Sequence, residues 1–136
     1  MVLTEHRRDG MCTVPVKTPP YYLAVDDCSD GVVISGWDCQ QVDVADSKGI
    51  TQSTINPTIN GQRVKYCHGV CCDSSGIYVA VCNDQPGTGH IHHYDEDGDF
   101  LQCICQGLQY PHGIALTADG QLAVADHGSI KVYHKV

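Results

Sequence analysis

Residues 110–126 read YPHGIALTADGQLAVAD, and a related stretch, YCHGVCCDSSGIYVAV, occupies residues 66–81. The two stretches align in register 44 residues apart. A third and weaker copy comes earlier, as YLAVD at residues 22–26 and DGVVI at residues 30–34, with a two-residue insertion in its first turn. Self-similarity at a period of this size indicates a repeat architecture rather than a chain of unrelated elements.

Every copy has the same order of short strands and turns. An apolar strand leads to an Asp-Gly or Ser-Gly turn, a second apolar strand, a polar loop and a third strand, and in the first two copies another Gly-containing turn leads to a fourth strand, whereas the third copy ends after its third strand. Four short strands per repeat are typical of a β-propeller blade. No segment has a sustained helical period with caps. The sequence therefore predicts an all-β partial propeller of about three four-stranded blades, at approximately residues 19–56, 66–105 and 110–136.

The copies resemble the NHL repeat, whose blades begin with Pro/His-Gly-apolar and carry Val-Ala-Asp in the second strand. The third copy has these features at Pro111, His112, Gly113, Val124, Ala125 and Asp126. The second copy has Cys82 where the motif prefers Asp, and the first has Tyr22 in place of the glycine. The resemblance is greatest to the C-terminal NHL domains of tripartite-motif (TRIM) ubiquitin-ligase-like proteins. It implies a substrate-recruiting module whose RING ligase region would lie elsewhere in a longer protein.

The number of copies is too small for a complete propeller, because a closed ring needs four to eight blades. We expect residues 1–18 to hold the remnant of a preceding blade, with residues 10–16 supplying a fourth strand to one of the blades. The chain is thus predicted to form half of a six-blade ring. It is either a fragment or a chain that self-associates with a second copy, and the second alternative must cover two exposed sheet edges by symmetry.

Composition and charge narrow the classes of partner. Eight Lys and Arg face 16 Asp and Glu, and the formal net charge is −8. This charge balance disfavours nucleic acid as a partner, since binding phosphate requires clustered cations. No apolar run has the length of a membrane helix, so we expect no membrane association. Nine cysteines without an export signal predict a cytoplasmic protein with reduced thiols, and an extracellular, disulfide-bonded protein is the alternative.

Four groups of residues contain potential metal ligands. Cys71 and Cys72 are adjacent in a strand and should point to opposite faces, which favours core packing over a shared ion. His90, His92 and His93 are expected to be solvated on an exposed outer strand, and Asp95 to Asp99 to form a tight turn. Cys103 and Cys105 share a face, but no Cys-x-x-Cys pair accompanies them. The sequence predicts no metal site, no cofactor and no catalytic residue, so this chain is expected not to be an enzyme.

The remaining prediction is a binding face. In a four-stranded blade the chain alternates ends, so the second-to-third and fourth-to-first connections share one side of the ring. Loops on a rigid scaffold commonly carry binding, and aromatic residues are plausible anchors there. The predicted binding face comprises Trp37, Asp38, Tyr66, His68, Asp84, Gln85, Tyr110, His112 and His127. We expect a protein or peptide partner, preferably a basic one, with single-stranded RNA as the alternative and a metal-dependent propeller enzyme as a weaker third.

Overall fold

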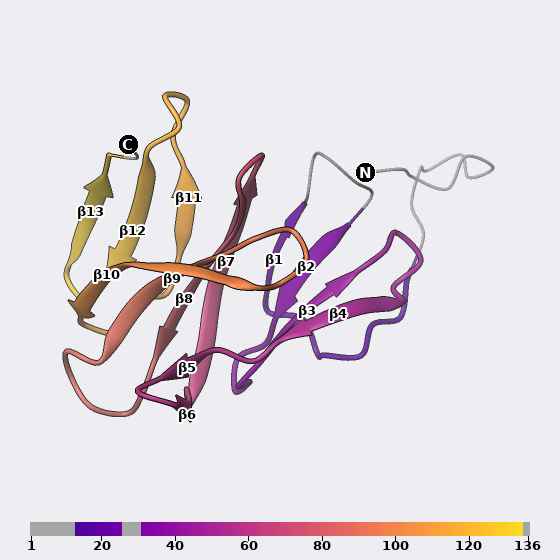
Figure 1. Cartoon of the computed structure of the whole chain (residues 1–136), viewed down its shortest axis with the longest axis horizontal. Coiled ribbons are helices and arrows are strands. Elements are labelled where there is room, and N and C mark those ends of the chain that lie inside the picture. Colours follow the sequence, from indigo (N-terminus) through magenta and orange to yellow (C-terminus); the bar gives the residue numbers. More distant parts are fainter. Residues whose placement is uncertain (1–12, 26–30, 135–136) are drawn as a thin grey trace.

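The computed structural model describes residues 13–25 and 31–134, where every helix or strand assigned is a β-strand. Three antiparallel sheets lie side by side (Figure 1). The first sheet contains β1 (Tyr22–Val25), β2 (Val32–Ser35), β3 (Val42–Ala45) and β4 (Thr51–Ile55), in the spatial order β1-β2-β3-β4. Each strand therefore pairs with the next one along the chain, as the blade pattern predicts.

The second and third sheets repeat this order. The second contains β7 (Tyr66–Asp73), β8 (Gly76–Cys82), β9 (Gly89–Tyr94) and β10 (Phe100–Leu108). The third contains β11 (Ile114–Leu116), β12 (Leu122–Asp126) and β13 (Ser129–Tyr133). The first strands of the sheets lie together, because β7 contacts both β1 and β11. The predicted fold class, an all-β partial propeller, is confirmed.

A small hairpin, β5 (Thr58–Ile59) and β6 (Gln62–Arg63), joins the first two sheets. Its turn is Asn60-Gly61, and both residues have positive φ, 54° and 80°. Two consecutive left-handed residues make the type I′ turn that suits the twist of a tight hairpin, and Asn-Gly is its favoured sequence. The chain thus crosses from blade to blade through a turn that its sequence specifies locally.

The turn between the third and fourth strands has the same construction in both four-stranded sheets. Asp46 accepts hydrogen bonds from the backbone amides of Lys48 and Ile50, at 2.9 and 3.0 Å. Asp95 accepts from the amides of Asp97 and Asp99, both at 2.9 Å. A carboxylate that binds backbone amides two and four residues ahead satisfies the turn without a ligand. The predicted tight turn at Asp95–Asp99 is confirmed.

The core consists of two layers, one on each face of the second sheet. The layer against the first sheet contains Val33, Val42, Ile55, Val64, Cys67, Val70, Ile77, Val79, Val81 and Tyr94. The layer against the third sheet contains Cys71, Tyr78, Ala80, Ile91, Leu108, Leu122 and Val124. Cys72 packs against the first layer and Cys71 belongs to the second, so the predicted opposite orientation of these cysteines is confirmed. Every residue of β8 is buried, which explains its continuous apolar sequence.

Backbone hydrogen bonds also connect the sheets. The amide of Cys67 donates to the carbonyl of Cys39 in the first sheet's β2–β3 connection, at 2.8 Å. The amide of Gly69 donates to the carbonyl of His112, just before β11, at 2.6 Å. Cys67 still pairs with Val81 of β8, but the register shifts between Cys67 and Val70, so Gly69 lies in the irregular part of the strand. The irregular start of β7 therefore joins all three sheets.

The prediction of a fourth strand over residues 10–16 is wrong for the described part of that range. Residues 13–16 form no strand, while residues 10–12 and the predicted strand remnant at residues 2–6 lie outside the described residues. The following segment instead reaches the buried carboxylate of Asp43, to which the Thr18 hydroxyl donates a hydrogen bond. Thr54 and Gln41 donate to the same carboxylate, at 2.9 and 3.1 Å. A buried carboxylate needs such donors, which fixes this segment over the first sheet.

The expectation that the histidines of β9 are solvated is also wrong. Only 3% of His92 and 7% of His93 is exposed, and His90 is half-buried. The strand is not at the edge of its sheet, since β10 pairs with it. His93 stacks on Tyr78 with ring centroids 4.3 Å apart, while His92 bonds to the hydroxyl of Tyr94. The polar histidines of β9 suggested an exposed strand, whereas the strand is buried.

Candidate functional site

An aromatic face is built from residues of all three sheets. We use this name for Tyr21, Tyr22, Trp37, Tyr66, His68 and His112. The residues come from the chain just before and at the start of β1, from the β2–β3 connection, from the start of β7, and from the segment before β11. The fold brings them together because the first strands of neighbouring blades lie side by side.

His68 is the centre of the aromatic face. Its ring stacks on that of His112, with centroids 4.7 Å apart and an interplanar angle of 8°. The rings of Tyr66 and Trp37 also stack with it, at 5.7 and 6.0 Å, and Tyr22 lies at 5.8 Å in a tilted orientation. His68 is only 6% exposed, whereas Trp37 is 56% exposed. His68 therefore supports the face, and Trp37 is available for contact.

Hydrogen bonds hold the central histidine in place. Nδ1 of His68 bonds to the carbonyl of Pro111 at 3.2 Å, and its own carbonyl accepts from the Ser35 hydroxyl. Since a carbonyl only accepts, Nδ1 of His68 carries the proton and Nε2 is left as the acceptor. Burial lowers the pKa of His68, partly opposed by the Pro111 hydrogen bond and reinforced by neighbouring His112. His68 is accordingly a neutral ring in a fixed tautomer at pH 7.

A polar network adjoins the aromatic rings. Asp84, in the β8–β9 connection, accepts hydrogen bonds from Lys65 at 2.6 Å and from the hydroxyl of Tyr66 at 2.9 Å. The hydroxyl of Tyr110 donates to the Asp84 carbonyl, also at 2.9 Å. The bonds from Lys65 and, to a smaller extent, from Tyr66 lower the pKa of the Asp84 carboxyl, and the bond to Asp84 raises the pKa of Tyr66. The network links loops of the second and third sheets.

Tyr110 has an unusual backbone conformation, with φ of 49°. Left-handed φ is uncommon for a bulky residue, and a residue before proline normally prefers the extended region. The hydroxyl bond to Asp84 and the half-buried position of the side chain help to maintain this geometry. Such outliers cluster at functional sites, so the conformation adds weight to this surface as a site.

The structure brings together most of the predicted binding face. Ring contacts connect Trp37, Tyr66, His68 and His112. Hydrogen bonds connect Tyr66 and Tyr110 to Asp84. The other three predicted residues are exposed on the surface: Asp38, Gln85 and His127. Asp38 lies close enough to contribute, after Asp84, to the raised pKa of Lys65. The amide of His127 bonds to the carbonyl of Gln109, beside Tyr110, at 2.7 Å.

Three residues of the site were missed by the sequence reasoning. Tyr21 contacts both Tyr22 and Trp37, each with centroids 5.2 Å apart, and Tyr22 bonds to Nδ1 of His112 at 3.5 Å. Lys65 forms an ion pair with Asp84. The signal was present, because Tyr21 and Tyr22, just before and at the start of β1, align with the His-Gly of the other copies. Tyr22 was aligned with the glycine of the repeat, but neither tyrosine was assigned to the predicted binding face.

The arrangement is suited to recognition. Exposed aromatic rings offer a large apolar contact at low entropic cost, and their polar tips can hydrogen-bond at the rim. The hydrogen bonds to Asp84 and the stacked histidines hold these rings in a fixed orientation before any partner arrives. No helix in the described ranges is long and apolar enough to cross a membrane.

The repeated sheets, with their first strands together and a face of loops at one end, define a repeat protein of the β-propeller class. Within it, residues 108–131 match the NHL repeat, which confirms the predicted resemblance for the third copy. A crystal structure of a protein from Lactobacillus plantarum, a structural-genomics target, is similar to this chain, with a TM-score of 0.52 and 20% identity. The match covers 88% of this chain and 39% of that protein, and at this identity it shows the fold alone. The comparison with curated proteins gave no match.

Proposed function

We propose that this chain is a non-catalytic protein-interaction module that binds a peptide segment of a partner on its aromatic face. The observation that carries the proposal is the cluster of Trp37, Tyr66 and His112 around the buried ring of His68. Binding hot spots are enriched in Trp and Tyr that are rigidly held and surrounded by residues that exclude water. Trp37, with 56% of its surface exposed in the free protein, is the expected anchor.

Charge favours a partner with exposed Lys or Arg, but the effect should be modest. The formal net charge of −8 attracts cations over the whole surface. Within the site, however, the Asp84 carboxylate already pairs with Lys65 at 2.6 Å, and both side chains are about half exposed. Asp38 is left as the main acidic group at the rim. The affinity should therefore fall only slightly as salt rises.

In the wider protein, this module would recruit substrates to a TRIM-type ubiquitin ligase in the cytoplasm, with the RING region carried elsewhere. The NHL repeat at residues 108–131 supports this context, as does the resemblance of the repeats to TRIM NHL domains. Single-stranded RNA is the alternative ligand, since exposed aromatic rings can stack on bases. RNA is disfavoured because Lys65, the lysine that contacts the network at Asp84 among residues 13–25 and 31–134, is already paired with that carboxylate.

Selection of peptides from a random display library against the intact chain would test the proposal. Trp37 is the single tryptophan of the chain, so its emission reports directly on the aromatic face. We expect selected peptides to shift this emission to the blue as the ring is buried. Trp37→Ala should weaken their binding, measured by calorimetry, by about 30-fold, the loss expected of a hot-spot residue.

Ile130→Ala is the matched control, because Ile130 is an exposed apolar residue, 76% exposed, on β13 and apart from the aromatic face. It should leave the affinity unchanged. Peptides that bind the wild type and the Trp37→Ala variant equally well would contradict the proposal. Micromolar or tighter binding of oligouridylate at physiological salt, lost in Trp37→Ala, would replace the peptide by RNA as the ligand.

A further inference from the structure

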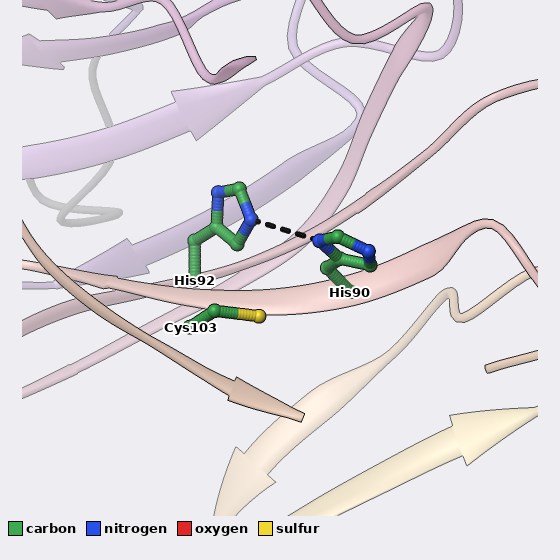
Figure 2. Close-up of side chains that lie close together, drawn as sticks. All are labelled: His90, His92 and Cys103. Carbon is green, nitrogen blue, oxygen red and sulfur yellow. Dashed lines mark hydrogen bonds between the residues drawn. The ribbon is translucent and has the colours of Figure 1, made fainter. Parts of the chain in front are cut away.

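Strands β9 and β10 bring together two histidines and a cysteine, away from the residues of the aromatic face. His90 and His92 lie on β9, and Cys103 lies on β10 directly opposite His92 (Figure 2). One nitrogen of each ring and the cysteine sulfur all lie within 4.8 Å of one another. His92 is buried, and the other two residues are half-buried. Two imidazoles and a thiol converge on one point.

We propose that His90, His92 and Cys103 form a zinc site that ties the outer strand β10 to β9. Imidazole nitrogen and thiolate sulfur are the donors that zinc takes in proteins, and a water molecule would complete the tetrahedron as the fourth ligand. The proposal goes beyond the peptide-binding function, since it concerns a different part of the second sheet. It also departs from the expectation, drawn from sequence, that these histidines hold no metal.

The geometry of the two rings agrees with a tetrahedral ion. Nδ1 of His90 lies 3.2 Å from Nε2 of His92. Zinc–nitrogen bonds of 2.0–2.1 Å at a tetrahedral angle separate two nitrogen ligands by about 3.3 Å. The corresponding nitrogen–sulfur separation is about 3.6 Å, so the present separations, at most 4.8 Å, have to shorten by at most about 1.2 Å. The rings are thus already spaced as ligands, and the cysteine requires a small adjustment.

A second layer of contacts orients His92 as a ligand. Its Nδ1 lies 3.1 Å from the hydroxyl of Tyr94, which is itself 4% exposed. When Nδ1–H donates to that oxygen, Nε2 carries the lone pair that points toward His90. The ring of Phe100 packs edge-on against His92 at 5.3 Å and against Tyr94 at 5.7 Å. These contacts fix both the tautomer and the ring orientation, as outer partners of metal-bound histidines do.

Protonation does not oppose binding at the two rings. Burial lowers the pKa of His92 to about 4, with a smaller contribution from His90, and burial also lowers the pKa of His90. Both rings are therefore neutral at pH 7. Burial raises the pKa of Cys103, so the thiol would lose its proton when the ion binds.

The backbone of β10 explains how the cysteine comes to lie there. The register of β10 with β9 shifts at three places, one of them between Cys103 and Cys105. Bulges of this kind re-aim side chains and are common at functional sites and sheet edges. The β10 strand is the outer strand of its sheet, where a metal bridge to the neighbouring strand would add most to its stability. The bridge would hold the outer strand against fraying.

Cobalt substitution of the full chain gives a direct test. The protein would be freed of metal with a chelator, kept reduced and titrated with Co²⁺. We expect a thiolate-to-cobalt charge-transfer band together with the intense visible bands of tetrahedral cobalt, with one ion bound per chain and full displacement by Zn²⁺. Zinc at a hundredfold excess over its dissociation constant should raise the thermal midpoint by about 10 °C.

Variants assign the ligands. Cys103→Ser should abolish the charge-transfer band, and His90→Gln should lower the affinity for cobalt at least tenfold. Cys105→Ser is the matched control, since Cys105 is another half-buried cysteine of β10 but packs with the core layer against the third sheet. It should keep both the band and the affinity. Far-ultraviolet circular dichroism of each variant without metal would establish that it is folded.

The proposal is overturned if cobalt gives no charge-transfer band, or if the band survives Cys103→Ser. It is also overturned if Cys105→Ser removes the band as completely as Cys103→Ser does, or if folded His90→Gln binds cobalt as tightly as the wild type. Should Cys103→Ser fail to fold, His90→Gln and the zinc-dependent thermal shift decide the matter. Because the assay uses no peptide, failure of the peptide-binding function would leave this result unaffected.

Discussion

Substitution of Gly69 by alanine should destabilise the protein strongly. The reason is not the backbone conformation, because the φ of Gly69 is not positive, but the lack of space for a side chain. A Cβ at this position would overlap the carbonyl oxygen of His112 and lie 3.0 Å from the Ile114 amide nitrogen. The segment before β11 would have to retreat by about 1 Å, which loses the hydrogen bond from Gly69 to His112. Overpacking costs about 1–3 kcal/mol and the lost bond about 1 kcal/mol, so we expect a loss of about 2–4 kcal/mol in the free energy of unfolding.

The third copy supplies the control for this experiment. Gly113 occupies the same position of the repeat, yet a Cβ built there would meet nothing within 4 Å. Gly113→Ala should therefore be neutral, or stabilise by a few tenths of a kcal/mol through the unfolded chain. Urea unfolding followed by circular dichroism would measure both variants. An equal loss of free energy of unfolding in the two variants, or no loss in Gly69→Ala, would refute the conclusion that close contact between the sheets requires glycine at position 69.

Two further predictions concern stability. Because burial lowers the pKa of His68 below its unfolded value, its contribution is fully present above about pH 6.5 and is lost as pH falls toward the folded pKa. With a chelator present, the urea concentration at the unfolding midpoint should decrease as the pH is lowered below about 6.5, and it should decrease less steeply in His68→Gln. Parallel pH profiles of the two proteins would exclude His68 as a source of this pH dependence. Leu122→Ala, at a residue with no exposed surface, should cost about 2–5 kcal/mol, whereas Val132→Ala, at a residue 49% exposed, should change the free energy of unfolding by about 0.5 kcal/mol or less. Similar losses in the two variants would contradict the placement of the core.

Local chemistry explains how much of the fold could be predicted from sequence. Turn positions such as Lys48-Gly49 and Asp97-Gly98 divide the chain into strands of fixed order, and the structure pairs each strand with the next. Because successive strands run in opposite directions, alternate connections lie at the same end of the blades. The sequence therefore predicts that Trp37, Tyr66 and His112 lie at one end, and the structure shows that their rings contact His68. These inferences depend only on neighbours along the chain or on the repeat period.

Other features depend on long-range geometry that the repeat does not specify. Cys103 lies opposite His92 because bulges shift the register of β10 against β9. No residue pattern in the sequence predicts these bulges. His92 and His93 are buried because β9 lies between β8 and β10 in the sheet and is covered by neighbouring side chains. Their polar residue type had suggested exposure to solvent. The left-handed φ of Tyr110, immediately before a proline, likewise contradicts local preference. Tertiary contacts override local signals at these places.

The backbone bonds from Cys67 to Cys39 and from Gly69 to His112 have a consequence for how such a chain can vary. Any residue other than proline has a backbone N–H that can form such a bond. The contact between two sheets therefore places few constraints on side-chain identity, apart from the need for glycine at position 69, where a Cβ would clash. Copies can then drift far apart in sequence and still assemble in the same way. This accounts for a chain in which one repeat, at residues 108–131, matches a family model while its neighbours adopt the same arrangement with different residues.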